Sequence, residues 1–303
     1  MSFLVRLPEN QYPAEALARL AAGPFNMAAG RAGVWLAQLA YEDEQDKIER
    51  IAQTWGLTTH AFFKPSVATI LPLTRTRGVI LQGRGARVIA FAGTDPLVAA
   101  DWVTDFDFQL DADGVHAGFG EALNAVWPDI AAALTGSARV DPLFIAGHSL
   151  GAALAVLCAV RAKQDFSVTP EAIYAFGMPR IGSAEFAMAF NQTLGHLTYR
   201  FVHGEDIVAT VPPSVLGFRH VGCLLTCRSH GKFELSQLQP PGSDNPKFTP
   251  ALLQALQSGI LQLLSSSLPP EIRPDLIGQA TRLLPPAIAD HLPDRYWKAF
   301  DAG

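Results

Sequence analysis

The stretch from Pro142 to Leu154 reads Pro-Leu-Phe-Ile-Ala-Gly-His-Ser-Leu-Gly-Ala-Ala-Leu, and it decides the fold. It begins as a short apolar run typical of a buried strand, passes through a Gly-x-Ser-x-Gly motif, and continues as an alanine- and leucine-rich helix. A serine on such a sharp turn has its hydroxyl exposed above the sheet, and the two glycines avoid a collision within the turn. The stretch therefore predicts a nucleophile elbow with Ser149 as the nucleophile. The motif without its strand and helix would also fit an ordinary Gly-Ser turn.

Composition narrows the class of protein. Hydrophobic residues make up 49% of the 303 residues and charged residues 17%, so the chain can bury a large core. The net charge of −5, without a basic block, argues against nucleic acid as a partner. Three cysteines, an odd number, argue against a disulfide framework. Length alone does not decide between one large α/β domain and two small ones.

The first ten residues suggest a location for the protein. The segment from Met1 to Asn10 lacks the apolar core and cleavage site of a signal peptide, and no uninterrupted apolar run is long enough to span a bilayer. We therefore expect a soluble protein without a transmembrane segment that is cytoplasmic or is secreted by a leaderless route.

The order of predicted elements indicates the architecture. We expect strands over 77–83, 87–92, 172–176, 198–203 and 218–227, and helices over 13–22, 26–55, 119–134 and 183–194. The acidic run Glu42-Asp43-Glu44 is interpreted as a solvated face. From mid-chain the strands alternate with helices, which predicts a mostly parallel central sheet with helices on both faces.

The region 237–284 differs from the rest. It opens on a proline-rich loop, and two apolar helices are expected over 249–265 and 275–284, each followed by a Pro-Pro pair. We interpret the region as a helical insert within a single domain over 1–303, not as a linker. The first helix either caps the site or packs on the core, and its sequence favours neither.

A serine nucleophile needs an oriented base and an acid. In α/β-hydrolases these partners follow the serine in the order Asp or Glu, then His. Asp206 comes just after the predicted strand 198–203, with Glu205 as its nearest rival. Among the histidines beyond the acid, His291 precedes the terminal helix and is the preferred base. Two others, His220 and His230, lie on or beside an apolar strand, which favours a structural role, although position alone does not exclude them.

Two backbone N–H groups would complete the chemistry as an oxyanion hole. One belongs to Leu150, the residue after the nucleophile. The other is expected from Thr94, in the loop after the strand that ends at Phe91, with its hydroxyl as a further donor. The alternative is that this loop is an ordinary turn.

A metal site is the remaining alternative from the residues. His220, Cys223, Cys227 and His230 suggest zinc, but four residues along a strand separate the two cysteines by roughly 13 Å, too far to share a metal. Serine-based acyl transfer needs no metal and no organic cofactor, and none is expected here.

Several short segments, taken in order, carry a resemblance to a known family. They are Leu39-Ala40-Tyr41, Phe91-Ala92-Gly93-Thr94-Asp95, Asp101-Trp102-Val103-Thr104-Asp105, Val115-His116-Ala117-Gly118-Phe119, Gly147-His148-Ser149-Leu150-Gly151, Phe176-Gly177-Met178-Pro179-Arg180-Ile181-Gly182, Val202-His203-Gly204-Glu205-Asp206-Ile207-Val208, Pro212-Pro213 and His291. With them the chain resembles the class 3 lipases, α/β-hydrolases that include the fungal triacylglycerol lipases and their bacterial and plant relatives.

The resemblance implies an α/β-hydrolase fold and a set of roles. Ser149 would be the nucleophile, Asp206 the acid and His291 the base, and Thr94 with Leu150 would form the oxyanion hole. A lid around 96–102 would cover the site and open at a lipid surface. Two departures stand out: Ala92 replaces the arginine that is usual before Gly-Thr, and the stretch between acid and base is longer than usual.

The expected activity is hydrolysis of triacylglycerols and other fatty-acyl esters through an acyl-enzyme, at an oil–water or membrane surface. A phospholipase A1, a short-chain or aryl (feruloyl-type) esterase, and a catalytically silent α/β-hydrolase used for binding remain as alternatives. The oligomeric state is left open by the sequence.

Overall fold

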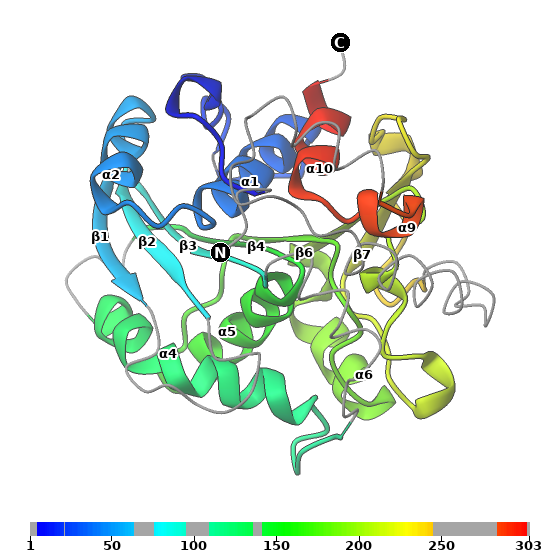
Figure 1. The fold of residues 1–303 in the computed structure, drawn as a ribbon. Helices are drawn as coiled ribbons and strands as arrows, with labels where there is room; N and C mark the ends of the chain where they lie inside the picture. Colours follow the sequence, from blue (N-terminus) through cyan, green and yellow to red (C-terminus); the bar gives the residue numbers. More distant parts are fainter. Residues whose placement is uncertain are drawn as a thin grey trace, which may run out of the picture.

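The protein is built on one mixed sheet. The computed structural model describes residues 5–20, 22–63, 76–94, 109–135, 141–244 and 284–301. The sheet has seven strands that lie side by side in chain order (Figure 1). These are β1 (Thr58–Phe63), β2 (Gly78–Gly83), β3 (Ala86–Phe91), β4 (Leu143–His148), β5 (Ala172–Phe176), β6 (Thr198–His203) and β7 (Cys223–Cys227). β1, β2 and β3 pair antiparallel, and every pair from β3 to β7 is parallel, as the alternation of strands and helices predicts.

Helices cover both faces of the sheet, and this expectation from the sequence is confirmed (Figure 1). One face carries α1 (Met27–Leu39), α2 (Gln45–Thr54) and α10 (Pro293–Asp301), and the other carries α4 (Ala117–Thr135), α5 (Leu150–Phe166) and α6 (Ala184–Thr193). The alternation of side chains along β4 separates the two cores: Ile145 packs with the α4–α5 cluster, whereas Phe144 and Ala146 pack with the α1 cluster. A strand buried on both faces reads as a continuous apolar run, which is why β4 is visible in the sequence.

Three local expectations need correction. Of the helix expected over 13–22, the described residues 13–20 form a series of turns instead, in which N–H groups bond to carbonyls three residues back, as Ala16 does to Pro13. The strand expected over 218–227 begins only at Cys223, because Gly222 adopts a φ of 78°. Strand β1 was not predicted, since its sequence Thr-Thr-His-Ala-Phe-Phe shows no clear alternation.

The acidic run at 42–44 is not uniformly solvated. The Glu42 side chain is buried, with a residue exposure of 3%. Its carboxylate accepts hydrogen bonds from the Leu7 N–H at 3.0 Å, the Tyr12 hydroxyl at 2.7 Å and the Lys47 ammonium at 2.6 Å. Three donors satisfy the charge, which is how a buried carboxylate is tolerated. A charged residue therefore ties the amino-terminal segment to the start of α2.

Two expected segments lie outside the described residues. These are the lid around 96–102 and, beyond Asp244, the insert with its helices at 249–265 and 275–284 up to residue 283. Within the described ranges, no helix has the length and apolar character needed to cross a membrane. The single-domain organisation over 1–303 remains our proposal.

Candidate active site

The elbow at Ser149 has the strained geometry that its motif predicts. Ser149 lies between β4 and α5 with φ 59° and ψ −130°, a conformation that L-residues rarely adopt. A Cβ on Gly147 would lie 2.1 Å from the Gly151 carbonyl oxygen, and a Cβ on Gly151 would lie 2.6 Å from the carbonyl oxygens of Phe91 and Ala92. The turn and its contact with the end of β3 therefore require glycine at both positions, which excludes an ordinary turn.

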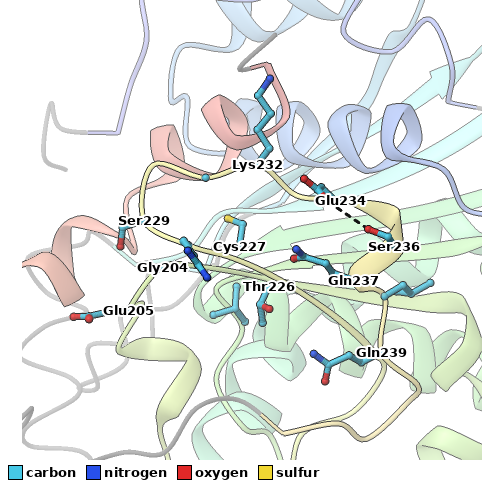
Figure 2. Close-up of a pocket in the computed structure, with 14 residues that line it drawn as sticks. Gly204, Glu205, Thr226, Cys227, Ser229, Lys232, Glu234, Ser236, Gln237 and Gln239 are labelled. Atoms are coloured by element: carbon cyan, nitrogen blue, oxygen red, sulfur yellow. Dashed lines mark hydrogen bonds between the residues drawn. The ribbon is translucent and has the colours of Figure 1, made fainter.

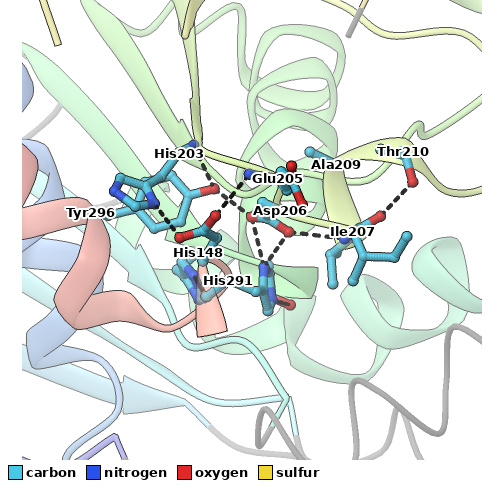
Figure 3. A network of polar contacts seen from close by, with 12 residues as sticks. His148, His203, Glu205, Asp206, Ile207, Ala209, Thr210, His291 and Tyr296 are labelled. Carbon is cyan, nitrogen blue, oxygen red and sulfur yellow. Dashed lines mark hydrogen bonds and ion pairs between the residues drawn. The ribbon is translucent and has the colours of Figure 1, made fainter. Parts of the chain in front are cut away.

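Three side chains from distant parts of the chain meet at this elbow. His291 Nε2 lies 2.9 Å from Ser149 Oγ, and His291 Nδ1 lies 2.8 and 2.9 Å from the two Asp206 carboxylate oxygens (Figure 3). All three residues are buried, with exposures of 2% or less. With Nδ1 protonated and bound to the carboxylate, Nε2 is free to accept the serine proton. The arrangement is compatible with a catalytic triad.

The Asp206 carboxylate is held by partners that sequence reasoning missed. The Tyr296 hydroxyl on α10 donates to Oδ2, and the Val208 N–H donates to Oδ1 at 2.9 Å. Burial, and then the nearby Asp206 charge, raise the pKa of Tyr296 well above its ordinary value, so the phenol stays protonated and remains a donor. The only signal for Tyr296 in the sequence is its place in the aromatic segment that follows His291.

Gly177 allows acid and base to approach each other. It follows β5 with φ 56°, and a Cβ there would lie 2.7 Å from Asp206 Oδ2 and 2.9 Å from His291 Nδ1. Any side chain would push the two groups apart. The glycine belongs to one of the segments that carry the family resemblance, but its role becomes visible only in three dimensions.

His148, inside the Gly-x-Ser-x-Gly motif, binds the backbone of His291. Its Nε2 lies 2.8 Å from the His291 carbonyl oxygen and must carry the proton, so Nδ1 accepts from the Tyr41 hydroxyl at 2.6 Å. Burial first, and then the proximity of His291, lower the pKa of His148 well below its ordinary value. A neutral ring therefore joins the end of α1 to the backbone of the base.

The rival acid and bases are placed elsewhere. Glu205 is exposed, and it is its backbone N–H, not its carboxylate, that takes part in the network. His220 is buried and its Nε2 donates to the Ala209 carbonyl at 2.9 Å, while His230 lies exposed in the turn after β7 with φ 61°. Of the histidines considered as bases, His291 is the one that the structure brings to Ser149.

Two buried neutral histidines predict how stability depends on pH. Burial is the main reason that the pKa values of His148 and His220 lie well below their ordinary value. Below pH ~6.5 the unfolded chain binds protons that the folded protein does not, so the free energy of unfolding should fall as the pH is lowered from ~6.5 to ~5. Each histidine contributes up to about 1.4 kcal/mol per pH unit.

Urea unfolding at several pH values measures this slope. The variant His220→Asn should lose about half of the histidine contribution, because one of the two linked protons is then gone. Stability that does not change between pH ~6.5 and ~5 would contradict the assignment of both rings as neutral.

The predicted oxyanion loop passes directly over the elbow. A Cβ on Gly93 would lie 2.6 Å from the His148 carbonyl oxygen and 2.7 Å from Ser149 Cβ, so the backbone leading to Thr94 touches the nucleophile. Leu150 is the first residue of α5, where backbone N–H groups are unsatisfied by the helix. In place of the missing arginine at 92, the Ala92 N–H donates to the Arg77 carbonyl at 2.9 Å. The backbone thus anchors this loop.

A large polar cavity lies apart from the triad. Its volume is about 1010 Å³ and it opens beside β6 and β7, where Glu205, Arg228, Ser229, Lys232 and Glu234 are among the residues that line it (Figure 2). None of Ser149, Asp206 and His291 lines it. Charged side chains of both signs make it unsuited to an acyl chain. Ser229 and Glu205 connect its wall to Asp290, the residue before His291, through hydrogen bonds.

Comparison with known proteins places this site in a family. Residues 88–216, which include the elbow and Asp206, match the family model described as lipase (class 3). Over these residues the chain is similar to the class 3 lipases. A solved structure, the lipase from Rhizopus microsporus var. chinensis, aligns with a TM-score of 0.57 over 83% of this chain and 90% of that one, at 24% identity. That likeness shows the α/β-hydrolase fold.

Two curated relatives match part of the chain. Secreted mono- and diacylglycerol lipase 1 of Fusarium solani is 39% identical over 129 residues, which are 40% of this chain and 38% of the relative. The secreted mono- and diacylglycerol lipase LIP1 of Malassezia globosa is 35% identical over 106 residues, 34% of this chain and 35% of the relative. The chain thus spans well under half the length of these relatives.

The location expected from the first ten residues is wrong. Both curated relatives are named as secreted, which points to secretion and contradicts a cytoplasmic protein. The lack of an apolar leader in those residues is weak information about the compartment. Export signals are informative only at the start of the translated chain.

Proposed function

We propose that the protein is a serine carboxylic ester hydrolase that acts on acylglycerols. The observation that carries the proposal is the continuous relay from Ser149 Oγ through His291 to Asp206, with each step between 2.8 and 2.9 Å. Such a relay activates an otherwise weak hydroxyl nucleophile. The proposal also draws on the similarity of residues 88–216 to the class 3 lipases.

The geometry supports a two-step acyl transfer. His291 Nε2 takes the hydroxyl proton as Ser149 Oγ attacks the ester carbonyl, and the resulting oxyanion lies between the N–H groups of Thr94 and Leu150. His291 then gives the proton to the departing alcohol as the ester bond breaks, leaving an acyl-enzyme. Water, deprotonated by His291, attacks this intermediate and releases the fatty acid. Asp206 holds the ring and stabilises its charged form throughout.

The names of the relatives support a substrate class, and the burial of Ser149 bears on how the substrate reaches it. Both curated relatives are named as mono- and diacylglycerol lipases, and a lipid ester is therefore our proposed substrate. We propose that the protein is secreted on the same basis. Ser149 has an exposure of 1%, and we propose that the protein opens to admit the ester. Opening at an oil–water or membrane surface would cost little hydrophobic free energy.

Hydrolysis of a series of mono-, di- and triacylglycerols of increasing chain length tests the proposal. Each is assayed above and below its solubility limit, with a phospholipid and a feruloyl ester alongside. Acylglycerol hydrolysis that exceeds the other two is the expected result. Preference for the phospholipid or the aryl ester would change the substrate class. A wild-type protein that hydrolyses no ester and does not react with a fluorophosphonate would contradict the reaction itself.

The role of Thr94 can be separated into backbone and hydroxyl parts. If the hydroxyl binds the oxyanion, Thr94→Val should lose about 3 kcal/mol of transition-state stabilisation, whereas Thr94→Ser should keep most of it. The measurement is kcat on a soluble ester. Equal kcat for Thr94→Val and the wild type would leave only the backbone N–H as a donor.

A further inference from the structure

A second histidine–aspartate pair lies beside the first and joins the same two loops. The acid loop, residues 203–206, carries Asp206, and the base loop, residues 290–291, carries His291. His203 Nδ1 on the acid loop lies 3.1 Å from Asp290 Oδ1 on the base loop. In the first pair, drawn in Figure 3, the acid loop supplies the carboxylate and the base loop the imidazole. In the second pair the acid loop supplies the imidazole and the base loop the carboxylate.

The Asp290 side chain is held by the acid loop and by the turn after β7. Its Oδ2 accepts the Glu205 N–H at 2.8 Å and the Ser229 hydroxyl at 2.6 Å. The carboxylate also rests on the backbone of Gly204, where a Cβ would lie 2.1 Å from Oδ2. Burial by itself would raise the pKa of Asp290, but the hydrogen bonds from His203, Glu205 and Ser229 outweigh it and hold the pKa below its ordinary value. The side chain is thus held by two hydrogen bonds, with His203 Nδ1 3.1 Å from its other oxygen.

The hydrogen bonds to Asp290 also affect the position of His291, because the two residues are neighbours in the chain. Asp290 is joined to His291 by one peptide bond, and its own N–H donates to the Pro286 carbonyl at 2.8 Å in the short helix α9 (Pro286–Ala289). Its backbone is held by α9 and its side chain by the acid loop. A change in the spacing of the two loops at Asp290 would therefore move the His291 ring, which must reach both Ser149 and Asp206.

We propose that His203 and Asp290 form a positioning pair, which fixes the spacing of the acid and base loops so that His291 stays aligned between Ser149 and Asp206. The inference rests on the proposed function, because its effect is on ester hydrolysis. Neither residue contacts Ser149 or touches the reacting atoms. Their contribution is to the alignment of the base, where a displacement of ~1 Å can lower the rate about a hundredfold.

Variants of both partners test the proposal on a short-chain soluble ester, with kcat and KM measured separately. Asp290→Ala should lower kcat by up to about a hundredfold with KM within about twofold of the wild type, and should slow phosphonylation of Ser149 by a fluorophosphonate to the same degree. His203→Leu should show the same loss. His203→Asn should recover most of the activity, because the amide nitrogen takes the place of Nδ1 as a donor to Asp290.

Glu42 offers a closely matched control. Like Asp290 it is a carboxylate with an exposure of 5% or less that accepts one backbone N–H, one hydroxyl and one basic side chain, but it joins the amino-terminal segment to α2. Glu42→Ala should lower the thermal midpoint and leave kcat at 25 °C unchanged. Every variant is assayed well below its own thermal midpoint.

The outcomes distinguish failure of the positioning pair from failure of the proposed ester hydrolysis. If Asp290→Ala behaves like Glu42→Ala, with a lower midpoint and an unchanged kcat, the pair is only structural and the proposal is overturned. If Asp290→Ala does not fold, the histidine variants decide: equal kcat for His203→Leu and His203→Asn overturns the proposal. A wild-type protein without esterase activity or phosphonylation would instead end the proposed function, and this inference with it.

Discussion

Replacement of Ser149 by alanine is expected to lower kcat for ester hydrolysis on the order of a million-fold while the protein remains folded. The serine hydroxyl has His291 as its hydrogen-bond partner, so its removal takes away the nucleophile and little else. Alanine and serine tolerate φ 59° about equally, which leaves the backbone of the elbow unchanged. The residual rate would come from the oxyanion hole and from substrate binding.

The matched control for this variant is Ser167→Ala. Ser167 ends α5 as Ser149 begins it, and its φ of 58° is almost the same. Ser167→Ala should keep the wild-type kcat and react with a fluorophosphonate, whereas Ser149→Ala should do neither. Thermal midpoints establish that both variants are folded. Near-normal activity in folded Ser149→Ala would disprove its role as the nucleophile.

The second large effect is expected for His291→Ala, which should lower kcat about as much as the loss of the serine, because members of a triad act as a unit. For the same reason the double variant Ser149→Ala/His291→Ala should be no slower than either single variant. Asp206 keeps its bonds to Tyr296 and the Val208 N–H in this variant, so the acid loop should hold its place.

Two other histidines serve as comparisons for the base. His230→Ala, at an exposed turn, should change neither kcat nor stability, and His220→Asn should change stability alone. The measurement is kcat on a soluble ester together with the thermal midpoint. A His291→Ala protein that keeps its activity, or a loss of activity in either of the other two variants, would move the base elsewhere.

Local chemistry explains what the sequence could predict. The elbow is determined within one strand, one turn and one helix, and its two glycines are required by contacts of atoms within or beside the turn. Strands β4, β5 and β6 are apolar runs bounded by clear turn residues. The place of Asp206 follows from the strand before it, since the carboxyl ends of parallel strands meet at one edge of the sheet.

Partners that are distant in the chain explain what the sequence could not predict. The Tyr41 hydroxyl reaches His148 across 107 residues, and the Tyr296 hydroxyl reaches Asp206 across 90. Glu42 was interpreted as solvated because its three donors come from other segments and from the next helix. The sequence could not decide among His220, His230 and His291 for the same reason. Strand and helix periodicity predicts the face on which a side chain lies but not which distant group it contacts.

Ester hydrolysis depends on the packing of α10 against the rest of the protein. This helix packs on α1 and β6, and the segment that contains it also delivers the base, its anchoring aspartate and the tyrosine on the acid. A single packed segment can detach at a lower free energy than the whole sheet requires to unfold. On heating, ester hydrolysis should therefore vanish before the far-ultraviolet circular dichroism changes. The amide protons of α10 should exchange with solvent sooner than those of β4 and β5. The loss of ester hydrolysis would then report the local detachment of α10 before the sheet unfolds.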